Sequence, residues 1–489
     1  MISIEKVDEV YIKVRCEPHI AAELSEFFTF EVPGAKFSPA FRNRVWDGKI
    51  RLYDKRNGKL YGGLLAYVRE FAKQNDLEVV QAPDVYSSTK IDIKDVEGFC
   101  KSLKPQSQGK DIEVRDYQIQ AIFQSLKRHK LLLLSPTASG KSLIIYSIVR
   151  FHQMANRKTL IIVPTTSLVE QMYSDFEDYG WNVDKYCHRI YHGYDKDVVK
   201  DVVISTWQSL ATLDKNYFKQ FECVIGDEAH NFKAKSLTGI MTALTNAKYR
   251  IGTTGTLDGT KTHKLVLEGL FGTVYRATST KTLIDKNQLS KLTIKCLVLK
   301  HNEADRRKIR NATYQEEMEY LTGHEVRNNV IRKLALRLSG NTLVLFQYVE
   351  KHGIPLYENI KTKADEGRKV FFVYGGTETV DRENIRSIVE NERDSIIVAS
   401  YGTFSTGINI RNLHNVIFSS PTKSRIRSLQ SIGRSLRQSE SKTDATLYDI
   451  ADDLSFGSYK NFTLNHFAER ITIYNEEQFD YQIHNIPLK

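Results

Sequence analysis

The sequence predicts an α/β protein with two parallel-sheet domains in tandem, a small α+β domain before them and a short helical tail after them. Short runs of Val, Ile and Leu alternate with helical segments from residue 114 onward, and the alternation restarts after residue 340. Strands that are apolar at consecutive positions suit a parallel sheet covered on both faces. A chain of 489 residues is also too long for a single core. The expected strands are residues 131–134, 160–163, 202–204, 223–225, 249–252, 343–346, 370–373, 396–399, 416–418 and 445–448.

Changes of pattern along the chain predict four segments. Residues 1–95 mix β-like runs with helical stretches, and a polar linker follows at 101–110. The first parallel-sheet domain is expected at 96–290 and the second at 291–452, with a charged helical stretch leading into the second. Residues 453–489 are rich in aromatic residues and are expected to form the helical tail.

Charge and cysteine content limit the class of protein. Lys and Arg outnumber Asp and Glu by 70 to 59, a formal net charge of +11, which favours a polyanionic partner. The five cysteines form no Cys-x-x-Cys pair, so we expect reduced thiols and neither a zinc site nor a disulfide framework. The N-terminus lacks a signal-peptide core, and no apolar run approaches the roughly 20 residues of a membrane helix. A cytoplasmic protein with no membrane partner is expected.

A phosphate-binding loop follows the first expected strand of the first parallel sheet. Gly140 lets backbone N–H groups point at phosphate oxygens, and the following helix adds the positive end of its dipole. Lys141 is placed for the β- and γ-phosphates of ATP, and the Ser142 hydroxyl for Mg²⁺. The full pattern has glycine where this chain has Ser135, but the Gly-Lys-Ser core is intact. The residues assigned to the nucleotide here are Thr137, Ala138, Ser139, Gly140, Lys141 and Ser142.

Two adjacent carboxylates follow another expected strand of the same sheet. Asp227 is placed to hold Mg²⁺ together with Ser142, and Glu228 to orient or deprotonate the attacking water. The alternative is a pair of solvated acids at a strand end. The phosphate loop upstream in the same sheet favours catalysis, with Lys141, Asp227 and Glu228 as its first three residues.

Two further segments carry groups that suit a nucleotide. The Gln118 amide suits the adenine edge, and Arg115 or Tyr117 could stack on the base. In the second domain, Arg434 and Arg437 are spaced i, i+3 and share one helix face. Such a pair suits a phosphate, and an arginine finger contributes roughly 10³–10⁵ in rate. The alternative is a solvated basic helix.

In this order the motifs resemble the motor core of superfamily 2 helicases, over residues 110–452. The resemblance implies two RecA-like domains with the ATP site between their sheets. The matching segments are 115–118 (Q-type motif), 135–142 (motif I), 163–171 (Ia), 205–208 (Ib), 227–230 (II), 254–256 (III), 343–349 (IV), 402–409 (V) and 430–437 (VI). The implied roles are hydrolysis for Gln430, Arg434 and Arg437, nucleotide binding for Gly407, and coupling to the nucleic-acid groove for His230, Thr254 and Thr256.

A closer resemblance, over nearly the whole chain, is to the bacteriophage UvsW-type recombination helicases. It rests on residues 37–54, 314–317, 399–402, 404–407 and 429–430. The family implies an ATP-dependent DNA helicase that unwinds and branch-migrates recombination and replication intermediates. It implies branched, duplex and single-stranded DNA as partners. An RNA–DNA hybrid, as in R-loops, and single-strand-binding or recombination proteins are further candidates, and the location would be the cytoplasm of the infected host cell.

Residues 36–59 have the composition of a nucleic-acid contact. They include eight basic and two acidic residues, with Phe37, Phe41, Trp46 and Tyr53 interleaved. Basic groups neutralise phosphates, and aromatic rings stack on bases or wedge into a duplex. The alternative is that the rings form the core of a small domain. The predicted DNA contacts are Arg42, Arg44, Trp46, Lys49 and Arg51.

Polar side chains in loops after the motor strands are expected to hold a phosphate backbone without reading its sequence. These residues are Thr165, Ser205, Thr206, Gln208 and Thr403. Because such contacts are generic, an RNA helicase or remodeller remains an alternative. A restriction-type motor subunit shares the same core, although the 37 residues after 452 are too few for a nuclease domain.

Overall fold

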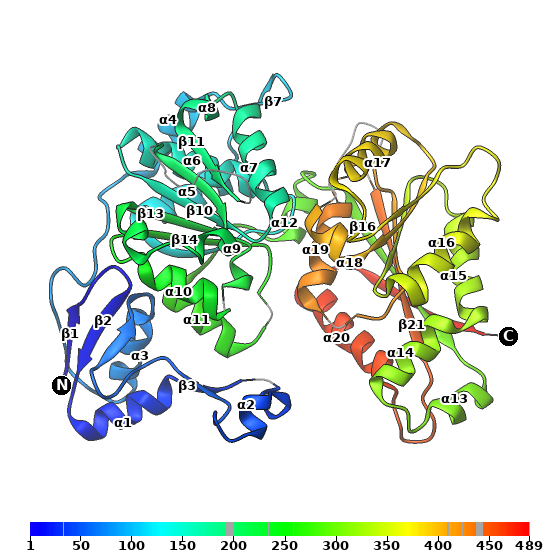
Figure 1. Ribbon diagram of the computed structural model, residues 1–489, viewed down its shortest axis with the longest axis horizontal. Helices are drawn as coiled ribbons and strands as arrows, with labels where there is room; N and C mark the ends of the chain where they lie inside the picture. The colour runs from blue at the N-terminus through cyan, green and yellow to red at the C-terminus, as the bar shows by residue number, and fades with distance from the viewer. Residues whose placement is uncertain are drawn as a thin grey trace. The chain divides into compact units, whose positions relative to one another are not determined.

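The chain forms two compact units, which we describe separately (Figure 1). One unit comprises Met1–Ser135 and Gly140–Ala277, and the other Pro136–Ser139 and Thr278–Lys489. Each contains a seven-stranded parallel sheet, which confirms the predicted tandem α/β architecture. The unit boundary follows Ala277, ahead of the break at 290 that the sequence pattern predicts. The computed structural model describes residues 1–32, 34–191, 200–232, 234–257, 259–407, 410–422, 424–436 and 444–488.

The N-terminal block is a small α+β domain, as expected. Its sheet has the order β5-β2-β1-β6, with β1 antiparallel to β2 and parallel to β6. A two-stranded ribbon, β3 with β4, carries the short helix α2 between its strands. The bounds are β1 (Ile2–Lys6), β2 (Tyr11–Arg15), α1 (Pro18–Phe27), β3 (Thr29–Glu31), α2 (Pro39–Arg42), β4 (Lys49–Arg51), β5 (Lys59–Tyr61), α3 (Leu65–Gln74) and β6 (Val79–Gln81).

This block is packed against α11 (Lys261–Phe271), a helix of the domain that contains the first large sheet. Leu265 of the motor lies in the hydrophobic core of the block. The Tyr67 hydroxyl donates to Glu268 Oε2 over 2.6 Å. A Cβ on Gly63 would lie 2.0 Å from the Glu268 carbonyl oxygen, so only glycine allows the two backbones this close. The N-terminal block is therefore docked on the first motor domain.

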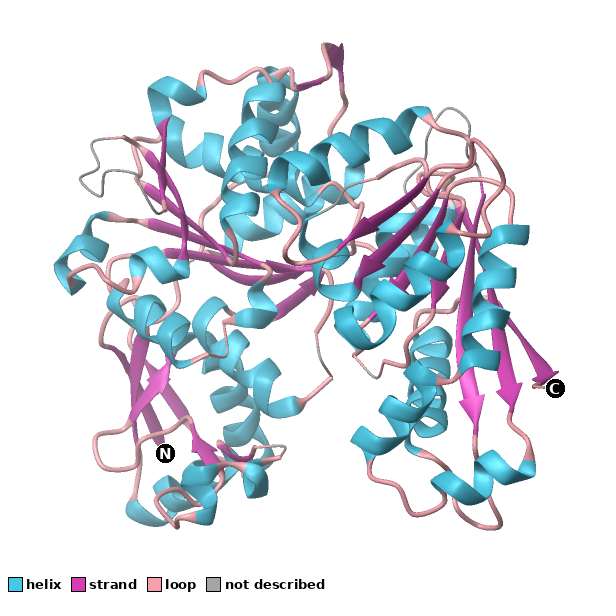
Figure 2. Cartoon of the chain, turned by 45° about the vertical axis from the view of Figure 1, so that its right-hand side comes forward, coloured by secondary structure: helices cyan, strands magenta, loops and turns pink. Residues whose placement is uncertain are grey.

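The first large sheet has the order β11-β12-β10-β13-β14-β9-β15. Figure 2 draws the strands in magenta and the helices in cyan. A helix, α4 (Ile93–Leu103), and a hairpin, β7 (Gln106–Ser107) with β8 (Lys110–Asp111), precede it. Its elements are α5 (Asp116–Arg128), β9 (Lys130–Leu134), α6 (Lys141–Met154), β10 (Thr159–Val163), α7 (Thr166–Asp178), α8 (Val183–Tyr186), β11 (Cys187–Ile190), β12 (Val202–Thr206), α9 (Trp207–Leu210), β13 (Cys223–Asp227), α10 (Lys235–Ala243), β14 (Tyr249–Thr254), α11 (Lys261–Phe271) and β15 (Val274–Arg276).

Both faces of this sheet are buried, which explains its uninterrupted apolar strands. Leu131 and Leu133 of β9 pack in a core with α5, α6 and α7, whereas Leu132 packs in a second core with α10 and α11. Successive side chains of a strand point to opposite faces, so each strand must be apolar at every position. The polar groups of the site consequently lie where the strands end.

The second large sheet has the order β18-β19-β17-β20-β21-β16-β22. The three helices between its strands β16 and β17 form the charged stretch that the sequence predicts at residues 303–337. The elements are α12 (Thr280–Asp285), β16 (Lys291–Lys300), α13 (Glu303–Ile309), α14 (Tyr314–Gly323), α15 (Glu325–Arg337), β17 (Thr342–Phe346), α16 (Ile354–Lys361), β18 (Val370–Val373), α17 (Thr379–Asn391), β19 (Ile396–Ser400), α18 (Tyr401–Gly407), β20 (Asn415–Phe418), α19 (Arg425–Ser435), β21 (Asp444–Asp453), α20 (Phe462–Glu476) and β22 (Tyr481–Pro487).

The C-terminal tail differs in part from the expected helical segment. It contains the helix α20, but it also contributes β22, which pairs in parallel with β16 over seven residues. Strand β22 lies at the sheet edge and is largely exposed, so it lacks the apolar run of a buried strand. The five cysteines are free thiols. No helix among the described residues is long and apolar enough to cross a bilayer.

Candidate active site

The predicted phosphate loop connects β9 to α6. Gly140 has φ +76°, in the left-handed region, and a Cβ there would lie 2.4 Å from Gln118 Nε2. Both the backbone angle and the space therefore require glycine. Ala138 also has a positive φ of 67°, and the loop leads into the first turn of a 14-residue helix. Lys141 and Ser142 open this helix, where backbone N–H groups and the helix dipole favour an anion.

The two predicted carboxylates meet the lysine of this loop. Asp227 is the last residue of β13 and is only 7% exposed, and the Thr253 hydroxyl donates to its Oδ1 over 2.7 Å. Lys141 Nζ lies 3.6 Å from Asp227 Oδ1 and 3.3 Å from Glu228 Oε1. Glu228 has φ +49°, a strained angle for a residue with a side chain. One ammonium group thus faces two carboxylates.

Strand β14 links the carboxylates to the phosphate loop, because it lies between β13 and β9. His230 Nδ1 is 3.0 Å from Thr254 Oγ1 and 3.4 Å from Glu228 Oε2. The Thr254 hydroxyl donates to the Thr256 carbonyl over 2.9 Å, and the Ser135 N–H donates to the Thr254 carbonyl over 2.9 Å. Since the Thr254 hydroxyl donates elsewhere, His230 Nδ1 donates to it. The three predicted coupling residues therefore form one hydrogen-bonded chain.

The predicted adenine contact lies against the phosphate loop. Gln118 is 3% exposed; its Oε1 accepts from the Arg115 N–H over 2.9 Å, and its Nε2 donates to the Gly140 carbonyl over 3.4 Å. Arg115 Nη1 donates to the Tyr117 hydroxyl over 3.3 Å. In this structure the Gln118 side-chain amide therefore contacts the phosphate loop through its hydrogen bond to Gly140. Adenine recognition by Gln118 stays a prediction.

The predicted groove residues of the first unit lie at the end of strand β12 or just after it, and just after the neighbouring strand β10. Thr165 caps α7 by accepting from the Leu168 N–H over 3.3 Å, and Thr206 Oγ1 lies 3.1 Å from Ser209 Oγ. Ser205 is fully buried and donates to the Ile190 carbonyl over 2.8 Å, so its hydroxyl is engaged inside the sheet. Gln208 lies in α9, directly after Thr206 and Trp207.

The residues that the sequence assigns to the second unit lie on α18 and α19. Thr403 is buried, with its Oγ1 2.8 Å from Ser400 Oγ, and Gly407 is the last residue of α18. Gln430 and Arg434 lie one turn apart on α19 and share a face. Arg437, the predicted arginine finger, falls outside the described residues.

The predicted DNA contacts of the N-terminal block lie on the segment from β3 to β4. Arg42, Arg44 and Lys49 are exposed, and Arg51 forms an ion pair with Asp47. Trp46 is half-buried, with its Nε1 donating to the Lys49 carbonyl over 2.9 Å.

Exposed apolar side chains accompany these cations. Sequence reasoning noted Phe37 and Phe41 as interleaved rings without assigning either to DNA, and it did not single out Val45. Phe37 is 76% exposed and Val45 82%, and Phe41 is exposed as well. Of the four aromatic residues in the basic segment, only Tyr53 lies in the core of the block. The alternative that these rings form the core is therefore wrong for Phe37 and Phe41. The cations and the rings together form a surface that suits bases and phosphates.

A phosphate loop and an Asp-Glu pair on one parallel sheet, followed in the chain by a second parallel sheet, define the class of two-domain helicase motors. Family models agree: "Type III restriction enzyme, res subunit" matches residues 111–259 and "Helicase conserved C-terminal domain" matches 326–439. A third model, "DNA helicase UvsW, N-terminal", matches residues 2–81.

Known relatives specify the family. The ATP-dependent DNA helicase uvsW of Enterobacteria phage T4 is 34% identical over 505 residues, covering all of both chains. The crystal structure of T4 UvsW aligns with a TM-score of 0.54 over all of both chains. The DNA-bound restriction-modification enzyme LlaBIII aligns with a TM-score of 0.59 at 15% identity, over 85% of this chain and 34% of that one, and shares only the fold. The chain belongs to the UvsW family of ATP-dependent DNA helicases.

Proposed function

We propose that this chain couples ATP hydrolysis at Lys141, Asp227 and Glu228 to the unwinding and branch migration of branched DNA. One observation carries the proposal. The phosphate-binding cation lies within 3.6 Å of both carboxylates, and His230 joins one of those carboxylates to Thr254. Hydrolysis and its mechanical output would thus start from a single connected cluster.

The residues present fit ATP and Mg²⁺. Lys141 would hold the terminal phosphates, with backbone N–H groups of Thr137, Ala138, Ser139 and Gly140 around them. Ser142 and Asp227 would hold Mg²⁺, which when bound neutralises charge on the β- and γ-phosphates. Among the described residues, the contacts from Thr253 and Lys141 both fall on Asp227 Oδ1. Asp227 Oδ2 would therefore be the oxygen that faces Mg²⁺. Glu228 would orient and deprotonate the attacking water.

The remaining assignments are part of the same proposal. Gln430, Arg434 and Arg437 would supply the second unit's contacts to the phosphates, with Arg437 as the arginine finger. The exposed segment from Phe37 to Arg51 would engage DNA at a branch. The uvsW relative is named a DNA helicase, and the matching N-terminal model favours DNA over the RNA and restriction-type alternatives. RNA–DNA hybrids and recombination or single-strand-binding proteins are candidate partners, in the cytoplasm of an infected cell.

DNA-stimulated ATP turnover of Glu228→Gln tests the proposal. The variant should bind ATP normally and hydrolyse it at least 100-fold more slowly, because only water activation is lost. Glu222→Gln is the matched control, since Glu222 is exposed just before the opposite end of the same strand. The control should turn over ATP at the wild-type rate. Normal turnover by Glu228→Gln would refute the assignment.

A further inference from the structure

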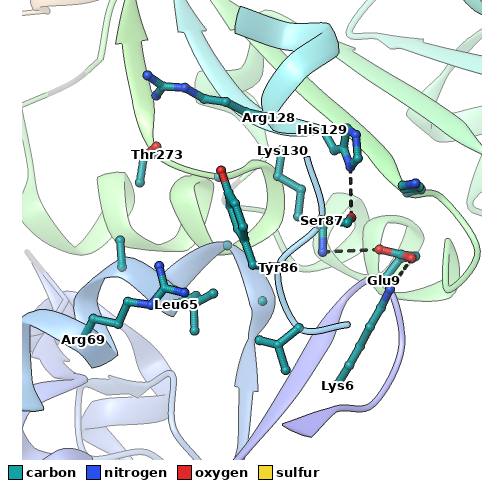
Figure 3. Close-up of a pocket in the computed structure, with 16 residues that line it drawn as sticks. Lys6, Glu9, Leu65, Arg69, Tyr86, Ser87, Arg128, His129, Lys130 and Thr273 are labelled. Atoms are coloured by element: carbon teal, nitrogen blue, oxygen red, sulfur yellow. Dashed lines mark hydrogen bonds and ion pairs between the residues drawn. The ribbon is translucent and has the colours of Figure 1, made fainter. Parts of the chain in front are cut away.

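A cleft of about 320 Å³ lies between the N-terminal block and the first motor domain (Figure 3). One wall comes from the block: residues after β1, the start of α3 and the loop after β6. The other wall comes from the motor: the end of α5, the start of β9 and Thr273. Lys130 begins β9, and the phosphate loop follows the other end of that strand. The cleft is therefore distinct from the ATP site.

Cations dominate the lining of this cleft. Lys6, Arg69, Arg128, Lys130 and Lys248 line it with a single carboxylate, Glu9.

Glu9 is already shared by two of these cations. Lys6 Nζ lies 2.5 Å from its Oε1 and Lys130 Nζ 3.5 Å from its Oε2. The other three, Arg69, Arg128 and Lys248, have no carboxylate within 4 Å among the residues that the structure describes. A concave site with such an excess of positive charge concentrates anions.

The lining also offers a surface for a planar ring. Tyr86 is 52% exposed at the cleft, and the Arg69 guanidinium lies 5.8 Å from its ring centroid. Figure 3 shows Arg69 and Tyr86 extending beside each other, with Leu65 close by. An aromatic ring next to guanidinium groups is the combination that binds a base and its phosphate.

We propose that this cleft binds one phosphorylated nucleotide, with the phosphate held by the cations of the motor wall and the base against Tyr86. The nucleotide is either free or the phosphorylated end of a DNA strand, because both present the same chemistry. The volume is at the lower end of the range for small-molecule sites, which are roughly 300–1,000 Å³. A duplex would not fit.

The state of Lys130 supports this assignment. Burial, with Arg250 and Lys6 adding repulsion, lowers the pKa of Lys130 to about 8 despite the nearby Glu9. A bound phosphate would supply the missing negative charge and raise that pKa. Binding near pH 8 should therefore take up protons. The neighbouring His129 stays neutral there, since burial lowers its pKa to about 4.

Titration calorimetry on the full chain tests the proposal with three probes: AMP, a 5′-phosphorylated oligothymidine and the same oligomer with a 5′-hydroxyl. Each is measured in a Lys141→Ala background, and a difference between the cleft variant and its control assigns binding to the cleft rather than to the ATP site. The cleft variant is Arg128→Ala with Lys248→Ala. Its matched control is Lys127→Ala with Lys73→Ala, which removes the same charge from exposed positions beside the cleft residues on α5 and α3.

AMP, the 5′-phosphorylated oligomer or both should bind to the parent protein. Their affinity should be at least tenfold lower for the cleft variant and unchanged for the control variant. AMP binding alone would identify a free-nucleotide site. A requirement for the 5′-phosphate on the oligomer would identify a strand-end site. Absence of saturable millimolar binding by both ligands, or equal loss in the variant and the control, would overturn the proposal. A Tm of the cleft variant within 2 °C of the parent excludes misfolding as the cause.

Discussion

His230 of the acidic motif and Thr254 of the adjoining strand are joined by a 3.0 Å hydrogen bond. The same imidazole lies 3.4 Å from Glu228, and the same threonine accepts a backbone hydrogen bond from Ser135 through its carbonyl. We therefore expect any movement of Glu228 on hydrolysis to be transmitted to the strand that abuts the phosphate loop.

Breaking this bond should separate hydrolysis from unwinding. His230→Ala leaves Lys141, Asp227 and Glu228 in place, so we expect ATP turnover within about fivefold of wild type, while unwinding falls by at least tenfold. Thr254→Val should act in the same direction. The measurement is the number of ATP molecules consumed per base pair separated. His188→Ala on β11 is the control, and unchanged consumption in both test variants would contradict the coupling role.

Removal of the Lys141 ammonium group should lower the affinity for ATP. Lys141→Ala loses a charge-assisted contact worth about 1.5–3 kcal/mol, which corresponds to roughly 10- to 150-fold weaker ATP binding. It also relieves Asp227 and Glu228 of their ammonium partner. Equilibrium binding of a fluorescent ATP analogue measures the effect. Wild-type affinity in this variant would mean that the loop does not hold the phosphates.

The exposed rings of the N-terminal block should contribute to binding of branched DNA. Phe37→Ala is expected to weaken binding to a fork about tenfold, because base stacking contributes roughly 1–3 kcal/mol. Val80→Ala, an exposed apolar residue on the edge strand β6, is the control. Point substitutions are preferable to deletion of the block, whose removal would expose Leu265 of the motor. Equal affinities of the two variants for forked DNA would argue against a stacking role.

Acid should destabilise the second unit through Asp452. Burial opposes ionisation of this carboxylate, but Arg327 and the hydrogen bond from His301 outweigh burial and lower its pKa to about 2. An unfolded aspartate titrates near 3.9. The stabilisation is therefore complete above about pH 4 and is lost as the pH falls toward 2.

Asp452→Asn should remove that stabilisation at neutral pH as well. Leaving Arg327 buried without its partner costs about 3–5 kcal/mol. Asp453→Asn, which breaks a partly exposed pair with Lys300, should cost under about 1 kcal/mol. Hydrogen exchange of β21 and α15 reports the difference. If Asp453→Asn loses as much protection as Asp452→Asn, the buried pair is not the cause.

Sequence reasoning located the strands that are apolar at every position, such as Leu131–Leu134 at the phosphate loop, because burial on both faces leaves a local signal. It missed the short strands β11 and β15 of the first large sheet and β16 and β22 of the second. Lys291 and Lys295 interrupt the apolar run of β16, and β22 is an exposed edge whose pairing partner is almost 200 residues away in the chain.

The candidate functional residues divide in the same way, into those that a local sequence pattern predicts and those that depend on tertiary packing. Lys141, Asp227 and Glu228 could be predicted because their chemistry follows strand ends, and the structure brings them together. The bracing contact of Gln118 with Gly140 and the exposure of Phe37 and Val45 depend on how distant segments pack, which no local pattern records.

The most direct test of the account compares ATP turnover and strand separation by the wild-type chain on forked DNA, linear duplex DNA and an RNA fork of the same length and charge. The account predicts strong stimulation and ATP-dependent strand separation on forked DNA, weaker stimulation by linear duplex, and little response to RNA. Equal stimulation by the RNA fork, or hydrolysis on forked DNA without strand movement, would contradict ATP-driven remodelling of branched DNA.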